Sequence, residues 1–318
     1  MGADNIRGAL LALAAMGIYA THDVVIKTLG AVYPSLQILF FASLMSFPLV
    51  SMVLMQDRTP GTLWPVNPGW VALRTVCSVL AGVGGFYAFS TLPLTQVYAI
   101  LFAAPLLVTI LSIPILGERV GLHRWSAVIA GLIGVLIVLR PGGRELSTGH
   151  LAALMVAFAS ATAAVVVRKL GRSERPMVLL LWPMLGNFVV TGASLGLEYR
   201  PMELQHLALA GVIAALGLTG GFLLIKAYRE GEAAIVAPMQ YSQILWATGY
   251  GWFLFGETVD MPTLIGASVI IVSGLYIVWR EGRGGNSAHR PVLEARLRPE
   301  TVTTPKTTIL QRLLSPRS

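Results

Sequence analysis

Apolar residues gather in ten stretches between Ile6 and Trp279, and short polar segments separate them. A helix needs about 20 mostly apolar residues to cross the hydrocarbon core of a bilayer. The pattern therefore predicts an all-α integral membrane protein with ten transmembrane helices. Prolines inside the stretches, among them Pro105 and Pro238, are predicted to kink their helices. The predicted spans are 6–29, 35–55, 70–91, 95–116, 123–140, 148–168, 177–197, 206–228, 233–255 and 262–279.

The first five stretches and the last five form an internal repeat. The dipeptide Gly-Glu closes the fourth stretch at 117–118 and closes the ninth at 256–257. Downstream, residues 134–140 (GVLIVLR) align with residues 274–280 (GLYIVWR). Because each half makes an odd number of crossings, the second half is predicted to lie upside down relative to the first. Inverted halves suit a carrier that opens a shared midplane site to each side in turn.

The distribution of basic residues predicts that both termini are cytoplasmic. Cytoplasmic loops are enriched in Lys and Arg. If the N-terminus is inside, ten basic residues fall in the inward connections and four in the outward ones. The inward residues are Arg58, Arg74, Arg119, Arg124, Arg168, Lys169, Arg172, Arg175, Lys226 and Arg229, and the outward ones are Lys27, Arg140, Arg144 and Arg200.

Composition agrees with this topology. The chain of 318 residues is 55% hydrophobic and 12% charged, with a mean hydropathy of +0.72, whereas soluble domains carry about twice that charged fraction. Loop topology accounts for the net charge of +8, which therefore does not indicate nucleic-acid binding. We predict a cytoplasmic N-terminus (1–5), a first repeat (6–140), a second repeat (148–280) and a disordered basic cytoplasmic tail (281–318).

Four segments carry a family resemblance. They are residues 19–23 (YATHD) followed by Lys27, residues 105–119 (PLLVTILSIPILGER), residues 140–142 (RPG) and residues 240–257 (QYSQILWATGYGWFLFGE). Together they resemble the EamA family of the drug/metabolite transporter superfamily, over nearly all of residues 6–280.

The resemblance implies two inverted five-helix EamA repeats with both termini in the cytoplasm. It also implies a cavity lined mainly by the first, third, fourth, sixth, eighth and ninth spans. The first and ninth spans look most like those of proteobacterial carriers of metabolites such as S-adenosylmethionine or riboflavin. Many of those carriers have an Arg in the second span, where this chain has residues 41–43 (FAS).

Three polar residues in the first span are candidates for coupling or gating. Asp23 and Lys27 are four residues apart and share one helical face, and ionisable groups inside a span usually face a partner or a wet cavity. One interpretation is a self-neutralising pair, with Lys27 reaching toward the interface. The other is that the pair gates the outer mouth, contacts a charged substrate group, or exchanges a proton at Asp23. His22 faces another side of the helix. It either forms a hydrogen bond within the packed interior or takes part in coupling or gating.

The ninth span is the main candidate for substrate binding. Gln243 and Trp246 lie on one stripe near its middle, with Gln240 and Tyr241 close by. An aromatic stripe also suits ordinary packing, but buried amides need partners. Aromatic faces and amides together suit a planar, polar ring. Tyr98 in the fourth span and Tyr87 in the third are candidates to complete the site, and packing explains them equally well.

These features predict a secondary-active transporter of a small metabolite, working by alternating access in a bacterial inner membrane. Uptake of a heteroaromatic metabolite such as riboflavin or S-adenosylmethionine is the first hypothesis, and export of amino acids, drugs or other small metabolites is the alternative. A membrane-embedded enzyme is remote, because no histidines pair at ligand spacing and Asp23 alone among the acids lies well inside a span. The expected partners are a small-molecule substrate and the lipid bilayer, without nucleic acid, metal or cofactor; the sequence specifies no oligomeric state.

Overall fold

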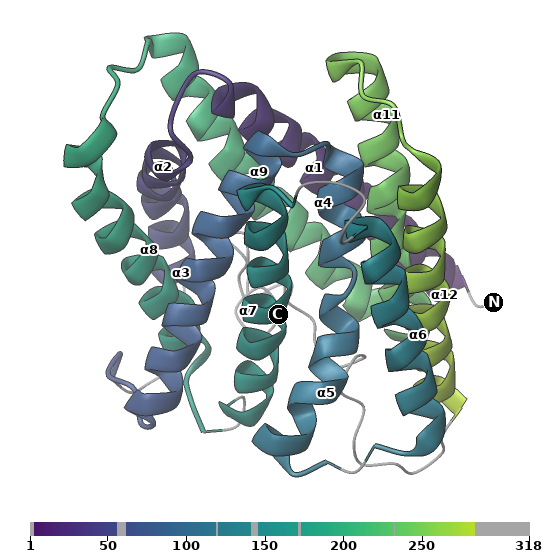
Figure 1. The fold of residues 1–318 in the computed structure, drawn as a ribbon. Coiled ribbons are helices and arrows are strands. Elements are labelled where there is room, and N and C mark those ends of the chain that lie inside the picture. The colour runs from purple at the N-terminus through teal and green to yellow at the C-terminus, as the bar shows by residue number, and fades with distance from the viewer. Residues whose placement is uncertain are drawn as a thin grey trace.

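The computed structural model describes residues 3–55, 62–118, 120–140, 146–170, 173–231 and 233–283. Within these ranges the regular elements are all helical (Figure 1). The α-helices are α1 (Ala3–Gly30), α2 (Ser35–Met55), α3 (Pro68–Thr91), α4 (Leu94–Leu101), α5 (Ala104–Leu116), α6 (Leu122–Leu139), α7 (Thr148–Leu170), α8 (Pro176–Glu198), α9 (Leu204–Glu230), α10 (Ala233–Val236), α11 (Gln243–Phe255) and α12 (Met261–Arg283), and a 3-10 helix, η1, covers Ala237–Ser242.

Several of these helices are long and apolar enough to cross a bilayer. Seven described segments meet that standard by length and composition, and shorter apolar helices occur at Ser35–Pro48 and Trp125–Leu139. The prediction of an all-helical protein with several membrane spans is therefore confirmed, while the number ten stays a prediction. The seven segments are Ile6–Gly30, Pro68–Thr91, Leu94–Leu116, Thr148–Leu170, Met177–Gly196, Leu204–Tyr228 and Met261–Trp279.

The fourth and ninth predicted spans are each interrupted, where the sequence pattern indicated continuous helices. The break between α4 and α5 falls just before Pro105, and the 3-10 turn of η1 contains Pro238 near its start. Proline lacks the N–H that an α-helix needs and clashes with the preceding turn. The expected kinks at these two prolines are therefore breaks in the regular α-helix, a two-residue turn after α4 and the 3-10 turn η1 before α11.

The two interrupted spans resume and end at equivalent residues. Helix α5 and helix α11 have the same length, and each begins and ends at the same distance from its Gly-Glu dipeptide. Each helix is closed by a glycine in the left-handed region, Gly117 with φ 73° and Gly256 with φ 64°. A glycine adopts this conformation without the steric penalty of a side chain. The repeated Gly-Glu dipeptide therefore marks the same helix end in both halves.

The main helix pairings join the two halves of the chain. Helix α1 lies along α9, α3 along α7, and α6 along α12. The pairs run antiparallel: a Cβ on Gly8, near the start of α1, would lie 2.6 Å from Gly231, which follows α9. A Cβ on Gly149, at the start of α7, would lie 2.6 Å from Thr91 at the end of α3. In the repeat, α1 corresponds to α7, α3 to α9, and α6 to α12. The pair α1–α9 is therefore equivalent to the pair α7–α3, and α6–α12 is equivalent to itself, as expected of a repeat.

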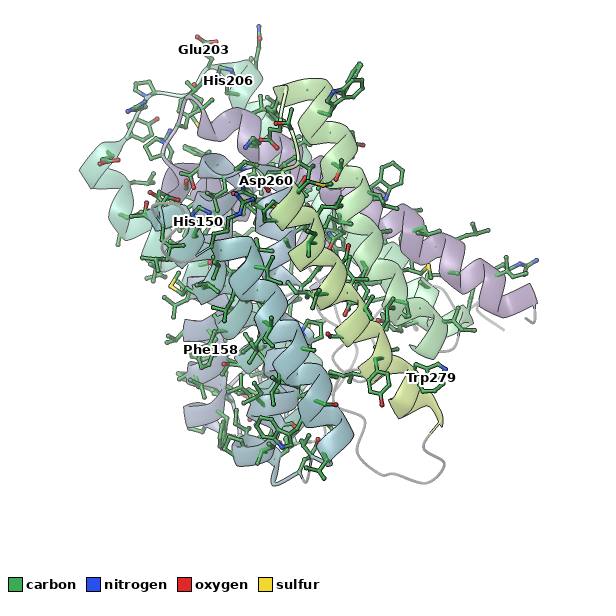
Figure 2. The ribbon with its side chains drawn as sticks, turned by 45° about the vertical axis from the view of Figure 1, so that its right-hand side comes forward. His150, Phe158, Glu203, His206, Asp260 and Trp279 are labelled. Carbon is green, nitrogen blue, oxygen red and sulfur yellow. The ribbon has the colours of Figure 1, made fainter. Side chains whose placement is uncertain are left out.

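The contacts define two ends of the bundle. Lys27, Leu94 and Glu257 meet at one end, and Glu118 and Arg168 meet at the other. Helix α4 lies toward the top of Figure 1 and α5 toward the bottom, so we call the end where α4 begins the upper end and the end where α5 stops the lower end. His150, Glu203, His206 and Asp260 lie toward the upper end and Trp279 toward the lower (Figure 2).

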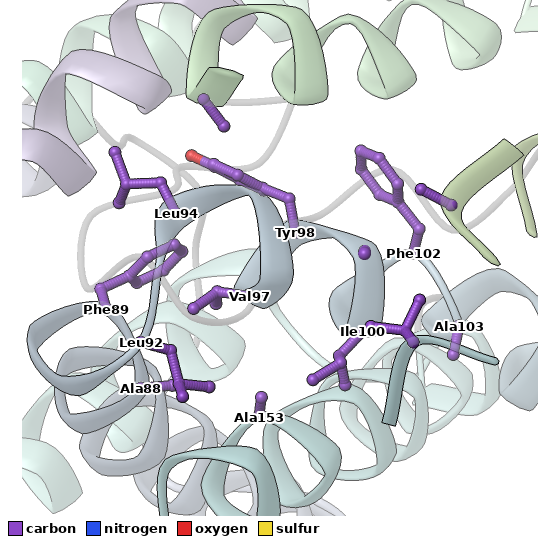
Figure 3. Close-up of a cluster of buried hydrophobic side chains, with 14 of the residues drawn as sticks. Ala88, Phe89, Leu92, Leu94, Val97, Tyr98, Ile100, Phe102, Ala103 and Ala153 are labelled. Atoms are coloured by element: carbon purple, nitrogen blue, oxygen red, sulfur yellow. The ribbon is translucent and has the colours of Figure 1, made fainter. Parts of the chain in front are cut away.

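The short helix α4 lies at the centre of the largest apolar cluster. Its residues Leu94, Val97, Tyr98 and Ile100 are buried almost completely. Val97 and Ile100 point toward α7, whereas Tyr98 lies on the opposite side of the helix (Figure 3). Helix α4 also contacts α6, α11 and α12, so its two faces meet both halves of the protein.

Candidate functional site

A buried carboxylate lies where α1 meets α4. Asp23 is 1% exposed, and its Oδ1 lies 2.7 Å from Nδ1 of His22. The hydroxyl of Tyr98 donates a hydrogen bond to Oδ2 of Asp23. His22 was expected on another side of the helix from Asp23 and Lys27, and its imidazole contacts the neighbouring Asp23 carboxylate. Carboxylate, imidazole and phenol all exchange protons, so the cluster has the chemistry of a proton site.

Lys27 forms its ion pair across the two halves of the chain. Its Nζ lies 2.8 Å from Oε1 of Glu257 and donates to the carbonyl of Leu92 at 2.6 Å. The other Glu257 oxygen accepts the N–H of Leu94 at 3.0 Å. One interpretation of the sequence paired Lys27 with Asp23; the structure pairs it with a glutamate of the second half. The pair joins α1, the α3–α4 turn and the end of α11.

A matching ion pair lies at the lower end. Oε1 of Glu118, which follows α5, is 2.5 Å from Nη2 of Arg168 near the end of α7. The next residue, Lys169, donates to the carbonyl of Ile115 at 2.8 Å. Each Gly-Glu glutamate therefore pairs with a base near the C-terminal end of the first helix of the opposite half. The repeat places one such pair at each end of the bundle.

The aromatic stripe of α11 faces α1. The rings of Trp246 and Tyr250 are stacked, with centroids 6.4 Å apart. A Cβ on Gly17 of α1 would lie 3.2 Å from the Trp246 indole, so that glycine lets the two meet closely. The Tyr250 hydroxyl lies 2.9 Å from Oγ1 of Thr21. Trp246 nevertheless stays 42% exposed, which leaves ring surface for another group.

The interruptions of the two split spans meet at a pair of aromatic rings. Phe102 and Tyr241, which occupy equivalent positions of the two repeats, lie edge to face with centroids 5.0 Å apart. Phe102 is 6.3 Å from Tyr98, whose ring is visible beside it in Figure 3. Gln243, the first residue of α11, is 7% exposed, and its Nε2 has no hydrogen-bond partner within the described ranges. An unpaired buried amide is costly.

The remaining candidates from the sequence lie apart or at the margin. Tyr87 is on the exposed side of α3, where its hydroxyl lies 2.7 Å from Oγ1 of Thr148. The structure therefore does not bring Tyr87 beside Tyr98. Gln240 belongs to η1 and is partly buried.

Sequence reasoning missed some residues of this region. Glu118 and Glu257 entered the sequence analysis only as part of the repeated Gly-Glu dipeptide, and Phe102 was not among the candidate residues. The constant spacing of the repeat was the available signal, because it places all of them at equivalent points. No group of His, Cys, Asp and Glu suited to a metal ion occurs in the described part of the chain.

A second ion pair at the upper end lies outside the spans. Arg140, which follows α6 with φ 47°, binds Asp260 just before α12. Partial burial acts to raise the pKa of Asp260, but hydrogen bonds from Thr263 and the charge of Arg140 outweigh it, so the pKa lies below its usual range. This pair closes the ends of α6 and α12 and does not involve α1.

Comparison with known proteins agrees with this architecture. The EamA-like transporter family model matches residues 6–140 and again residues 147–280. The S-adenosylmethionine uptake transporter of Rickettsia bellii is 27% identical over 82% of this chain and 90% of its own length. The riboflavin transporter of Vibrio cholerae is 28% identical over 66% and 71%, and the pseudopaline exporter of Pseudomonas aeruginosa is 25% identical over 84% and 94%.

A solved crystal structure, 16% identical, superposes with a TM-score of 0.54 over 88% of this chain and all of that one. This likeness concerns the fold alone.

Apolar helices, paired halves and matching relatives define the class of the protein: it is a multi-pass membrane transporter of small metabolites. The chain belongs to the EamA-like transporter family, whose model it matches twice.

Proposed function

We propose that the protein is a secondary-active transporter that works by alternating access. The observation that carries this proposal is the contact between Phe102 and Tyr241, where the interruptions of two repeat-related spans meet. Discontinuous helices at the interface of inverted repeats commonly form the substrate and ion sites of carriers. Ten spans with both termini cytoplasmic, in a bacterial inner membrane, complete the proposed arrangement.

The substrate site lies beside these interruptions. Gln243 supplies a buried donor without a partner, and Trp246 supplies exposed ring surface one turn further along α11. Tyr98 and Tyr241 flank the interruption, with Gln240 beside them. Rings and amides suit a planar heteroaromatic solute. Relatives named for S-adenosylmethionine uptake and for riboflavin transport agree with such a solute, and the name of the first favours uptake.

The two cross-half ion pairs act as gates. Lys27–Glu257 ties α1 to the end of α11, and Glu118–Arg168 ties the end of α5 to α7. Their separation opens the upper or the lower end respectively. The two pairs occupy equivalent positions in the two halves. A movement of the first half that separates one pair therefore has a counterpart in the second half, which separates the other pair and opens the opposite end.

Asp23 couples transport to a proton. It lies on α1 one turn before Lys27, and Tyr98 of the split fourth span binds it. A change in the position of α4 alters the bonds that stabilise the Asp23 carboxylate, and hence its affinity for a proton. His22 is the adjacent acceptor.

Export is the second candidate function, favoured by the relative named as a pseudopaline exporter. The same site and gates serve either direction, and the orientation of the driving gradient decides between them.

The proposal is tested with purified protein in liposomes. Uptake of labelled S-adenosylmethionine and of riboflavin is measured with and without an inward proton gradient, in wild type and in Gln243→Leu. Leu245→Ala, on the exposed face of the same helix, is the matched control. We expect one solute to accumulate in wild type and in the control and to fail in Gln243→Leu. Equal uptake by all three proteins removes Gln243 from the site.

Topology is tested separately. Reporter fusions after Ser318 and within residues 198–204 are expected to report opposite sides of the membrane. The same side at both points contradicts the inverted repeat.

A further inference from the structure

Arg74 of α3 is partly buried, and two of the three nitrogens of its guanidinium have no partner in the described part of the chain. Its Nε and Nη1 atoms are inaccessible and make no hydrogen bond within the described residues. Buried charges are normally paired and hydrogen-bonded, because the surroundings no longer supply the bonds that water made. Ionisable groups at membrane depth mark functional sites by default.

The side chain of Arg74 does not lie on the face of α3 that is exposed to lipid or the interface. Residues three and four apart share a helical face, and the neighbours of Arg74 at these spacings, Val71 and Ser78, are buried. The exposed face of α3 carries Leu73 and Val76 instead, with exposures of 38% and 55%. Arg74 therefore lies on the interior face of α3.

The described acidic residues nearby in the fold make contacts of their own, although Oε2 of Glu174 is buried without a hydrogen-bond partner in the described ranges. Glu118 pairs with Arg168, and Glu174 accepts the N–H of Asn67 at 2.5 Å. Other bases at the lower end have partners too, as Lys169 has in the carbonyl of Ile115 and the ring of Trp70. Arg74 thus differs from the bases around it, whose positive charges are used in structural contacts.

The same face of α3 leads to the candidate substrate site. Phe89, further along this face, has its ring 5.4 Å from that of Tyr98. At a rise of about 1.5 Å per residue, Arg74 lies about 22 Å from Phe89 toward the lower end. Arg74 and the ring that contacts Tyr98 therefore lie on one side of α3, at different depths.

We propose that Arg74 binds the carboxylate or phosphate group of the transported solute on the lower side of the site. The planar guanidinium presents paired N–H donors that match both groups. The inference rests on the proposed function and narrows it, because the substrate is then an anion-bearing metabolite. S-adenosylmethionine has a carboxylate, whereas riboflavin has neither a carboxylate nor a phosphate until it is phosphorylated.

The test compares ligands that differ by one anionic group. Thermal stabilisation of the purified full chain is measured with S-adenosylmethionine against its decarboxylated form, and with flavin mononucleotide against riboflavin. Wild type, Arg74→Gln and Arg74→Lys are compared, and Lys226→Gln serves as control because that lysine is half exposed on α9. Inorganic phosphate alone, and nanodiscs with or without phosphatidylglycerol, separate a solute from a lipid headgroup.

We expect wild type to prefer the anionic member of at least one pair. Arg74→Gln should weaken that member about 10-fold to 100-fold and leave the neutral one unchanged, as for loss of a hydrogen bond between charged groups. Arg74→Lys should keep part of the preference and Lys226→Gln all of it. Without ligand, Arg74→Gln should melt no lower than wild type, because it removes an unpaired buried charge.

Three results overturn the assignment. The first is equal stabilisation of wild type and Arg74→Gln by every solute, in which case the proposed transport function survives without it. The second is an effect of Arg74 seen with phosphatidylglycerol alone. The third is a lower melting temperature of ligand-free Arg74→Gln, which indicates a structural partner. If no member of either pair and no phosphate stabilises wild type, the proposed substrate class fails as well.

Discussion

Breaking the Lys27–Glu257 pair should open the upper end of the transporter. The ionised groups lie 2.8 Å apart with side chains 14% and 15% exposed, so solvent screens them only partly. In Glu257→Gln the amide oxygen can still accept the N–H of Leu94, and Lys27 keeps the carbonyl of Leu92. The change therefore removes the charge interaction and little else. A charge-assisted contact of this kind contributes about 2 kcal/mol, which shifts the closed-to-open ratio about 30-fold.

The shift is measured by cysteine accessibility. Thr95 of α4 is buried and follows Leu94, which donates to Glu257. Thr95→Cys is introduced after Cys77, the only native cysteine, is replaced by alanine. A membrane-impermeant maleimide is added from the side at which α11 ends. Labelling should rise in Lys27→Gln and in Glu257→Gln, and the double variant should resemble either single one, since the interaction is already lost.

The control and the refuting result follow from the second ion pair. Asp260→Asn breaks the contact to Arg140 at the same end without touching α1, so it should leave labelling unchanged. The charge reversal Lys27→Glu with Glu257→Lys should restore slow labelling in part, because the ion pair returns while the bonds to Leu92 and Leu94 do not. If the single variants label at the wild-type rate, or if their effects simply add, the pair is not a gate.

Three further results are expected. Asp23→Asn should reduce proton-driven transport while membrane abundance stays near normal; proton-driven uptake at the wild-type rate would exclude Asp23 from coupling. Gln243→Leu should weaken substrate binding by about 1–3 kcal/mol, the cost of removing a polar partner, and Trp246→Ala should weaken planar ligands more than aliphatic ones. The matched control Trp252→Ala, which alters a side chain that is 69% exposed, should leave the binding of both planar and aliphatic ligands unchanged. Ligand-induced stabilisation measures binding in Gln243→Leu, Trp246→Ala and Trp252→Ala. Since the pKa of Asp260 is lowered on folding, its contribution to stability is present above the unfolded pKa of about 3.9. That contribution is lost as pH falls through the lower folded value, so wild type should lose more of its melting temperature in strong acid than Asp260→Asn, and equal losses would contradict this reasoning.

Hydropathy alone predicted the helical class and most of the spans, because bilayer thickness fixes the length of each apolar stretch. It did not predict the interruptions before Pro105 and around Pro238, since proline signals a kink whose extent depends on tertiary packing. The partner of Lys27 was missed for a related reason. Spacing along one helix suggested Asp23, whereas the fold brings Glu257 from the other half.

The candidate site was predicted unevenly. Asp23, Tyr98 and Gln243 were singled out as unusual polar or aromatic residues in apolar spans, and the structure places all three at buried positions. Tyr87 looked the same in sequence, yet it faces outward beside Thr148. Residue type and depth in a span do not specify the direction of a side chain, which depends on the packing partners of the helix.

The pairing of helices between the two halves has a consequence for how the protein is made. Helix α1 packs on α9, which begins at Leu204 and ends at Glu230. At about 5–20 residues per second, the ribosome completes α9 about 10–40 seconds after α1. During that interval the first half lacks its main partners, so the insertion machinery or lipid must cover faces that later meet protein. The same arrangement means that a chain divided between α6 and α7 should give two fragments that depend on each other: each should be degraded when expressed alone, and both should persist when expressed together.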